Sequence, residues 1–529
     1  MSPNTLFSLP EELILQILEY FPKYVLFKLR FVNRAFDRLV TPLAFRAIRF
    51  RAYQDEPCKF IDIAVTEHLR RHVREVTIDT WNSRICARPP FMDAIPFISL
   101  LSKLETLHLR FNYDETLSNF WWQKGTRDEE LRVLKAVFES LAGSWSWKDP
   151  EDVDTWDNLL ASCDSTVEKV SWPLFPTDKP LPIKKLTVSN LRNFLEKDLA
   201  TSPAFQTVMN SNTLKDLRLY IAPKVDKEPG YDVSSPTDTS LFHNLPHTWL
   251  TPKIASNLRV LSLYCHHPWG WLPKMDFRLI GVNGLPNLKT LALGNYEFSH
   301  WWQVEWFGSL GIEKLYLDEC TVLHSEINWD GMERDTSETI VQDYQGEVHH
   351  FSNEGYYVQG AEKQSARCEA KPAKRNLRWH HIFSHWTKSM PNLRVFKLAQ
   401  GGWDDTPEQW KAIDPTYYGE HYECTSDLDD WKDLHQQWEH TAFMHFECPA
   451  PLTTGTGIRK YGSEAVQEYG AVFPYVDFVE PWENVDYRGA PCPRLSVRMN
   501  REEEKMDKEV FYEFLTVVDR RRRGFLVQD

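Results

Sequence analysis

Apolar residues at the start of the chain follow a helical period. The opening stretch SLPEELILQILEYF predicts a helix from about Leu9 to Phe21. Ser8 and Glu11 fit a capping box, and Pro10 suits the first turn, where a missing N–H is harmless. The chain is therefore expected to begin with an amphipathic helix.

The apolar surface of this helix is wider than one neighbouring helix needs. At about 100° per residue, its apolar side chains cover an arc of roughly 160°. The arc consists of Leu13, Ile14, Ile17, Leu18, Tyr20 and Phe21, with Leu15 extending it. Part of this surface is therefore available for a second contact.

A second helical pattern comes next in KYVLFKLRFVNRAFDRLVTPLAFRAIRF. Asn33 interrupts it and Thr41-Pro42 is expected to close it. The apolar positions are Val25, Leu26, Leu29, Val32, Phe36 and Leu39. The two patterns form a unit of roughly 40 residues, at or below the size that usually folds unaided. Its surplus apolar surface must dock on the rest of the chain or on a partner.

The spacing of these residues resembles the F-box. The resemblance covers residues 6 to about 50, where L-P-x-E-L, then I-L, then R-x-V-N-R-x-F occur in order. The matching positions are Leu9, Pro10, Glu12, Leu13, Ile17, Leu18, Leu29, Val32, Asn33, Arg34 and Phe36. The alternative is an ordinary helical subdomain that packs on the rest of the chain.

The resemblance implies a docking face for a Skp-type adaptor. The residues expected to contact the adaptor are Leu9, Pro10, Leu13, Ile14, Ile17, Leu18, Val32 and Phe36. Leu15, Leu26 and Leu29 are assigned to the interior of the helical unit. The family's members are substrate receptors of Skp, cullin and F-box ubiquitin ligases, and they perform no chemistry themselves.

A short phrase then recurs through the body of the chain. It is HVREVTI at 72, KLETLHL at 103, TLKDLRL at 213, NLRVLSL at 257, NLKTLAL at 287, GIEKLYL at 311 and NLRVFKL at 392. It resembles L-x-x-L-x-L, the strand of a leucine-rich repeat, and helix-like stretches lie between several copies. Strands are expected at 73–78, 104–109, 214–219, 258–263, 288–293 and 312–317, adjacent and parallel in one curved sheet.

The spacing of the repeats is irregular. Starts at 258, 288 and 312 are 30 and 24 residues apart, whereas the next start, at 393, comes 81 residues later and indicates an insertion. The predicted fold is α/β: a helical F-box over residues 1–50, an irregular solenoid over 51–400, and a capping region over 401–529 that ends in a helix. A non-repetitive α/β domain is the alternative.

Composition narrows the class of partner. The 529 residues carry 61 Lys plus Arg against 75 Asp plus Glu, a net charge of −14, so neither nucleic acid nor an anionic membrane is the expected partner. No apolar run is long enough for a membrane span, and no signal peptide is recognised. The expected location is the cytoplasm, the nucleus or both. The nine scattered cysteines are interpreted as reduced thiols.

Catalytic and metal-binding patterns are weak. His381 and His385 stand at i and i+4, but no acid follows in the HExxH manner. GTGIRKYG lacks the Lys-Ser/Thr of a phosphate loop. No cofactor, metal or catalytic residue is predicted. An enzyme site after residue 400 stays open as an alternative, to be identified by a pocket with converging acids or histidines.

Tryptophans are the remaining excess, at 21 in the chain. Trp269, Trp271, Trp301 and Trp302 come after repeat strands and are the candidate contacts for an unknown protein substrate. Burial of all four would assign them to packing instead. The sequence thus favours a substrate receptor that binds a Skp-type adaptor and, through it, a cullin, with a ubiquitin-independent scaffold as the alternative.

Overall fold

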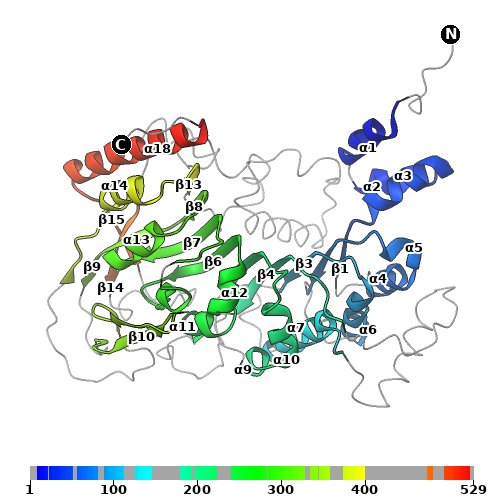
Figure 1. Cartoon of the computed structure of the whole chain (residues 1–529), viewed down its shortest axis with the longest axis horizontal. Helices are drawn as coiled ribbons and strands as arrows, with labels where there is room; N and C mark the ends of the chain where they lie inside the picture. Colours follow the sequence, from blue (N-terminus) through cyan, green and yellow to red (C-terminus); the bar gives the residue numbers. More distant parts are fainter. Residues whose placement is uncertain are drawn as a thin grey trace, which may run out of the picture. The chain divides into compact units, whose positions relative to one another are not determined.

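The chain folds into two compact α/β units. A computed structural model describes residues 9–21, 23–51, 56–80, 89–111, 126–145, 179–192, 197–222, 240–282, 284–327, 334–343, 345–357, 373–399, 473–479 and 494–524. One unit comprises Met1–Val188 and Glu196–Leu214, the other Ser189–Leu195 and Lys215–Asp529. Both combine helices with mostly parallel strands, which confirms the predicted α/β class (Figure 1).

The first unit begins with three helices, α1 (Glu11–Glu19), α2 (Lys23–Leu29) and α3 (Arg34–Ala44). The Pro10 carbonyl starts α1 by accepting the N–H groups of Leu13 and Ile14 at 3.0 and 3.2 Å. Pro10 offers no side-chain cap, and Ser8 of the expected capping box lies outside the described residues.

Asn33 separates α2 from α3 because it caps the second of these helices. Its side-chain oxygen accepts the Phe36 N–H at 2.9 Å. The prediction that Thr41-Pro42 closes the helix is wrong, since α3 continues to Ala44 with Pro42 inside. In the last turn a proline removes little more than one hydrogen bond, so the helix tolerates it.

Strands alternate with helices in the rest of this unit. β1 (Ala47–Arg51), β2 (Glu75–Asp79) and β3 (Thr106–Arg110) pair in parallel, and β4 (Lys185–Arg192), whose residues up to Val188 belong here, is next to β3. The helices are α4 (Glu56–Val65), α5 (Glu67–Arg70), α6 (Pro89–Ala94), α7 (Thr126–Ala142), α9 (Lys197–Ala200) and α10 (Pro203–Met209). The sequence prediction did not include β4, which takes the place beside β3 that was predicted for 214–219.

The second unit contains five parallel strands in a row. They are β5 (Asp216–Ala222), β6 (Val260–Trp269), β7 (Thr290–Phe298), β8 (Lys314–Asp318) and β13 (Val395–Ala399). The predicted adjacency of the four repeats from 214 to 317 is confirmed, although each strand starts two residues later than expected. The first apolar residue of each phrase, such as Leu258 or Ile312, is a buried residue before the strand.

The same hydrogen-bond pattern sets the register where these strands begin. The Lys215 carbonyl accepts the N–H groups of Arg259 and Val260, at 2.8 and 3.0 Å. The carbonyls of Arg259, Lys289 and Glu313 each accept two successive N–H groups from the next strand in the same way. Each strand is therefore positioned by the one before it.

The expected insertion between 312 and 393 contains regular structure. β9 (Thr321–Ile327) pairs with the end of β7, with β12 (Ala373–Lys374) and with β14 (Tyr475–Val479), which in turn pairs with β15 (Arg494–Val497). A hairpin of β10 (Glu338–Gln342) and β11 (Val348–Ser352) forms a separate two-stranded sheet. The remaining helices of the unit are α11 (Ser240–Asn244), α12 (Pro252–Asn257), α13 (Trp301–Gly308), α14 (Trp379–Ser389) and α18 (Arg501–Arg522).

The C-terminal helix α18 lies beside α14 (Figure 1). Phe511 and Phe514 are buried and pack against Phe383 of α14, with ring centroids 5.0 and 5.4 Å apart. Arg521, in the last turn of α18, donates to the carbonyls of Thr387 and Met390 at the end of α14.

Cysteines differ between the units. Cys265 and Cys320 are buried thiols, and burial raises the pKa of Cys320 well above its usual value. Cys58 is disulfide-bonded, so the expectation of reduced thiols throughout is wrong. Its partner is not among the cysteines of the described segments.

Within the described segments, no helix is both long and apolar enough to span a bilayer.

Candidate functional site

Large apolar side chains are exposed on the N-terminal helices. Among the described residues, seven of the twelve most exposed ones fall between Leu9 and Val32. We call this set the N-terminal apolar surface: Leu9, Leu13, Ile17, Tyr20, Phe21, Phe31 and Val32. Leu13 and Ile17 are four residues apart in α1, so they lie in one stripe along this helix. Such exposure makes these helices the candidate interaction surface of the described residues.

The same helices bury a separate set of side chains. Ile14 and Leu18 are 3% and 1% exposed, and they pack with Leu26 of α2 and with residues of α3. One face of α1 therefore builds the interior while the adjacent face meets solvent. This division explains why the first helix has more apolar surface than one neighbouring helix needs. The interior of the helical unit is filled without the exposed stripe.

Polar contacts fix the turn that carries Phe31 and Val32. The Arg30 guanidinium donates to Asp37 and to Thr41 at 3.0 Å, and it lies 4.7 Å above the ring of Phe45. Hydrogen bonds from Thr41 and Arg30 hold the pKa of the Asp37 carboxyl below its usual value. The α2–α3 turn is thus held in place while its two apolar residues stay 86% and 61% exposed.

The predicted adaptor contacts are divided by this geometry. Leu9, Pro10, Leu13, Ile17 and Val32 are exposed, and all but Pro10 belong to the N-terminal apolar surface.

Ile14, Leu18 and Phe36 are buried, so their assignment to the contact face is wrong: they fill the interior of the helical unit. Leu26 belongs to the buried cluster of the three helices, as predicted. Leu15 and Leu29 are partly buried and pack against this cluster. Tyr20, Phe21 and Phe31 are also exposed, although they were not among the predicted contacts.

The tryptophans also divide into two kinds. Trp269 and Trp271 are 0% and 1% exposed, and their indole N–H groups donate to the carbonyls of Gly294 and Gly355 at 2.7 and 2.9 Å. Their assignment to a substrate surface is therefore wrong, because their rings are enclosed by packing.

The next pair of tryptophans remains accessible. Trp301 is 44% exposed and donates to Glu305, while Trp302 is partly buried with the Arg278 guanidinium 4.0 Å above its ring. These two stay candidates for contact with a partner.

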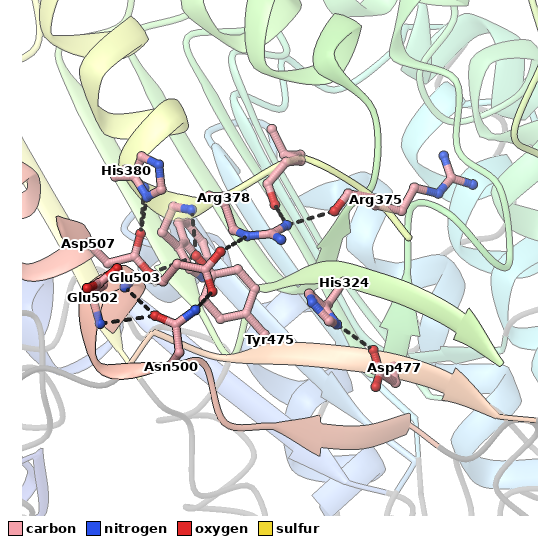
Figure 2. Close-up of polar contacts among 12 residues, drawn as sticks. His324, Arg375, Arg378, His380, Tyr475, Asp477, Asn500, Glu502, Glu503 and Asp507 are labelled. Atoms are coloured by element: carbon pink, nitrogen blue, oxygen red, sulfur yellow. Dashed lines mark hydrogen bonds and ion pairs between the residues drawn. The ribbon is translucent and has the colours of Figure 1, made fainter. Parts of the chain in front are cut away.

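A polar cluster joins α14, β14 and α18. Figure 2 shows that His380 and Tyr475 converge on Asp507. The carboxylate is 1% exposed, accepts the His380 N–H at 2.9 Å and lies 2.8 Å from His380 Nδ1. It also accepts the Tyr475 hydroxyl at 2.7 Å, and that hydroxyl accepts the Trp379 N–H at 2.9 Å. Burial and the neighbouring Asp507 raise the pKa of Tyr475 well above its usual value.

A second pair in Figure 2 links β9 to β14. Asp477 accepts the Ser325 hydroxyl at 2.5 Å and lies 2.9 Å from His324 Nδ1. A serine nucleophile needs direct contact with its base, but here Ser325 and His324 both face the carboxylate. The cluster in Figure 2 therefore has the geometry of structural acceptors that join strands and helices.

Metal-binding geometry is limited within the described segments. The one group with three potential ligands in reach of each other is Asp343, Glu347 and His349, at the hairpin turn. Asp343 there accepts the N–H groups of Gln345 and Glu347 and lies 3.1 Å from His349 Nε2, so its contacts are those of a turn.

The His381 and His385 pair suggested by the sequence does not form such a group in the described part of the chain. Burial lowers the pKa of His381, and the ring of His385 packs edge-on against Trp301. Packing therefore explains His385, whereas His381 is an exposed residue of α14.

Comparison with known proteins does not assign the chain to a family. The sequence matches no protein-family model, and a search of curated proteins also found no match.

Proposed function

We propose that the chain is an F-box protein, a substrate receptor that binds a Skp-type adaptor and, through it, a cullin. The observation that supports this most is the N-terminal apolar surface. Leu13 and Ile17 face solvent although the helices already have a filled interior. An adaptor that covers this surface would remove exposed apolar area, which is the usual source of binding free energy.

We further propose that the parallel strands belong to an irregular leucine-rich-repeat solenoid that carries a protein substrate. Two observations support this. The phrase in which each strand begins recurs along the chain, and the carbonyls just before the strands accept N–H groups in one repeated pattern. Trp301 and Trp302 are the proposed substrate contacts. The receptor's contribution to ubiquitin transfer would be proximity, not chemistry, in the cytoplasm or nucleus.

The test is the double variant Leu13→Asp with Ile17→Asp. Each side chain should contribute about 1 to 3 kcal/mol to adaptor binding. The double variant should therefore bind a purified Skp-type adaptor at least about 30-fold more weakly, which corresponds to about 2 kcal/mol. Circular dichroism should show the helix content of the unaltered protein, because both positions are exposed.

The matched control is Ile340→Asp with Val348→Asp, which changes two exposed aliphatic residues of the hairpin. This control should bind the adaptor as the unaltered protein does. If the unaltered chain fails to bind, or if the Leu13/Ile17 variant binds equally well, the proposal is wrong. Adaptor binding without cullin-dependent ubiquitination of a co-purifying protein would favour the scaffold alternative.

A further inference from the structure

The β10–β11 hairpin is a two-stranded sheet with two open edges. In the described part of the chain, no other strand pairs with it. Its base is fixed to the unit: Asn353 is 4% exposed and accepts from Lys274 Nζ at 2.7 Å and from Thr339 at 2.9 Å. The Arg278 guanidinium lies 4.6 Å above Phe351. The hairpin is thus a supported structure whose outer edges remain open.

The register shows which backbone groups face outward. Asp343 donates its N–H to the Glu347 carbonyl at 2.9 Å, and Asn353 donates to Ser337 at 3.2 Å. In an antiparallel ladder, alternate residues bond to the partner strand and those between them point away. The N–H and C=O groups of residues 338, 340 and 342 therefore point away from β11.

The outer edge of β10 lacks the residues that usually prevent an edge strand from pairing with another chain. Natural edges are blocked by lysine, proline or a covering segment, yet Ile340 is 61% exposed and the segment from 335 to 354 contains no lysine, arginine or proline. It contains five acids, Asp335, Glu338, Asp343, Glu347 and Glu354. An apolar, acidic edge suits a strand that brings basic and apolar residues.

We propose that the outer edge of β10 binds an extended protein segment in which basic and apolar residues alternate. The segment would add a third strand, with main-chain hydrogen bonds to Glu338, Ile340 and Gln342. Glu338 and Ile340 share the exposed face of β10, so the basic side chains of the segment would lie on that face beside Glu338, whose side chain is 60% exposed. Its apolar side chains would lie on the opposite face, beside Thr339 and Val341. This binding does not depend on the N-terminal helices or on the proposed adaptor.

The probe is a nine-residue peptide of alternating lysine and valine, blocked at both ends and labelled for fluorescence anisotropy. It should bind the full chain at 150 mM salt. A second peptide, N-methylated at alternate residues, lacks the donors of one edge and should bind at least tenfold more weakly. This comparison uses the unaltered protein, so it does not depend on the folding of a variant.

Two variants locate the edge. Ile340→Lys should weaken binding of the lysine–valine peptide at least tenfold, whereas Val348→Lys, on the opposite strand, should change it less than threefold. Both replace an exposed aliphatic residue and add one positive charge, so their difference reports the edge. Absence of peptide binding up to 1 mM, equal binding of the N-methylated peptide, or equal effects of the two variants would each overturn the proposal.

Discussion

At the scale of single residues, some ionisable side chains of the second unit are held in place by contacts inside the fold. Asp507 holds three hydrogen-bonding groups of two other elements, and His300 is enclosed at the start of α13. Removing one member leaves its partners without water or protein contacts, which costs more than the net value of each bond. These positions should therefore be more sensitive than their surface neighbours.

Replacing Asp507 with alanine should destabilise the protein by about 2 to 4 kcal/mol, because the His380 and Tyr475 donors would lose their shared acceptor. Chemical denaturation followed by tryptophan fluorescence measures this effect. Glu513→Ala, on an exposed position of the same helix, should change the free energy of unfolding by less than about 0.5 kcal/mol. Equal effects would contradict the role given to Asp507.

His300 makes the stability dependent on pH. Burial, and secondarily the Arg375 charge, lower its pKa to about 3, against about 6.5 in an unfolded chain. Below pH 6.5 the unfolded chain takes up a proton that the folded chain does not, so stability falls as the pH falls. Between pH 7.5 and 5.5 this residue should account for a loss of about 1.4 kcal/mol.

The measurement is the denaturation midpoint across that pH range for the unaltered chain and for His300→Gln. The variant should show the shallower dependence, since glutamine does not titrate. His350→Gln, at an exposed position of the hairpin, serves as the control. Unchanged slopes in His300→Gln would show that another group carries the pH dependence.

For the N-terminal residues, the sequence predicted which ones are helical better than it predicted which ones face the interior. Periodicity placed Ile14, Leu18 and Phe36 correctly on helices, but an apolar arc of roughly 160° cannot say which part faces inward. That choice depends on where α2 and α3 pack, which is a tertiary property. Phe31 lay outside the periodic positions because it belongs to the turn, and only the structure showed it exposed.

At the scale of elements, α1 should separate stability from binding. Leu18→Ala should cost about 2 to 5 kcal/mol, because a buried leucine leaves a cavity. Leu13→Ala should change stability by less than about 1 kcal/mol, since its side chain is 46% exposed. Thermal unfolding and adaptor binding, measured on both variants, check this separation. A large stability loss in Leu13→Ala would place that residue in the interior.

Strand prediction succeeded where the phrase was regular. β5 to β8 each begin inside a copy of the leucine phrase, two residues after the predicted start. β4 (Lys185–Arg192) was missed because none of the predicted strands included this segment. The pairing of β9 with β14 could not be predicted, since it joins segments far apart in sequence and no local pattern records it. The hairpin pairs neighbouring segments, but this region was interpreted only as an insertion.

At the scale of the whole molecule, the last helix completes the second unit from a distant part of the sequence. Phe511, Phe514 and Val518 are buried, and Arg521 binds carbonyls at the end of α14. The sequence predicted this helix but not what it covers. The contacts make the fold of residues 378–398 dependent on a segment more than a hundred residues away.

Phe514→Ala should therefore lower the free energy of unfolding by about 3 to 5 kcal/mol. Tyr512→Ala, at a 46% exposed position of α18, should cost less than about 1 kcal/mol. Hydrogen exchange should show faster opening of α14 in the Phe514 variant and unchanged protection in the Tyr512 variant. Unchanged protection of α14 in both would mean that the two helices open independently.

The carbonyl just before each strand accepts two successive N–H groups at the start of the next strand. This pattern bears on where residues can be inserted into the chain. The register of β8 on β7 and of β13 on β8 is the same, although the paired residues are 24 positions apart in one case, Thr290 and Lys314, and 81 in the other, Lys314 and Val395. Closing the longer connection costs only about 1 kcal/mol more in chain entropy. These connections are therefore places where evolution, or a protein engineer, can insert a new segment without moving the strands on either side.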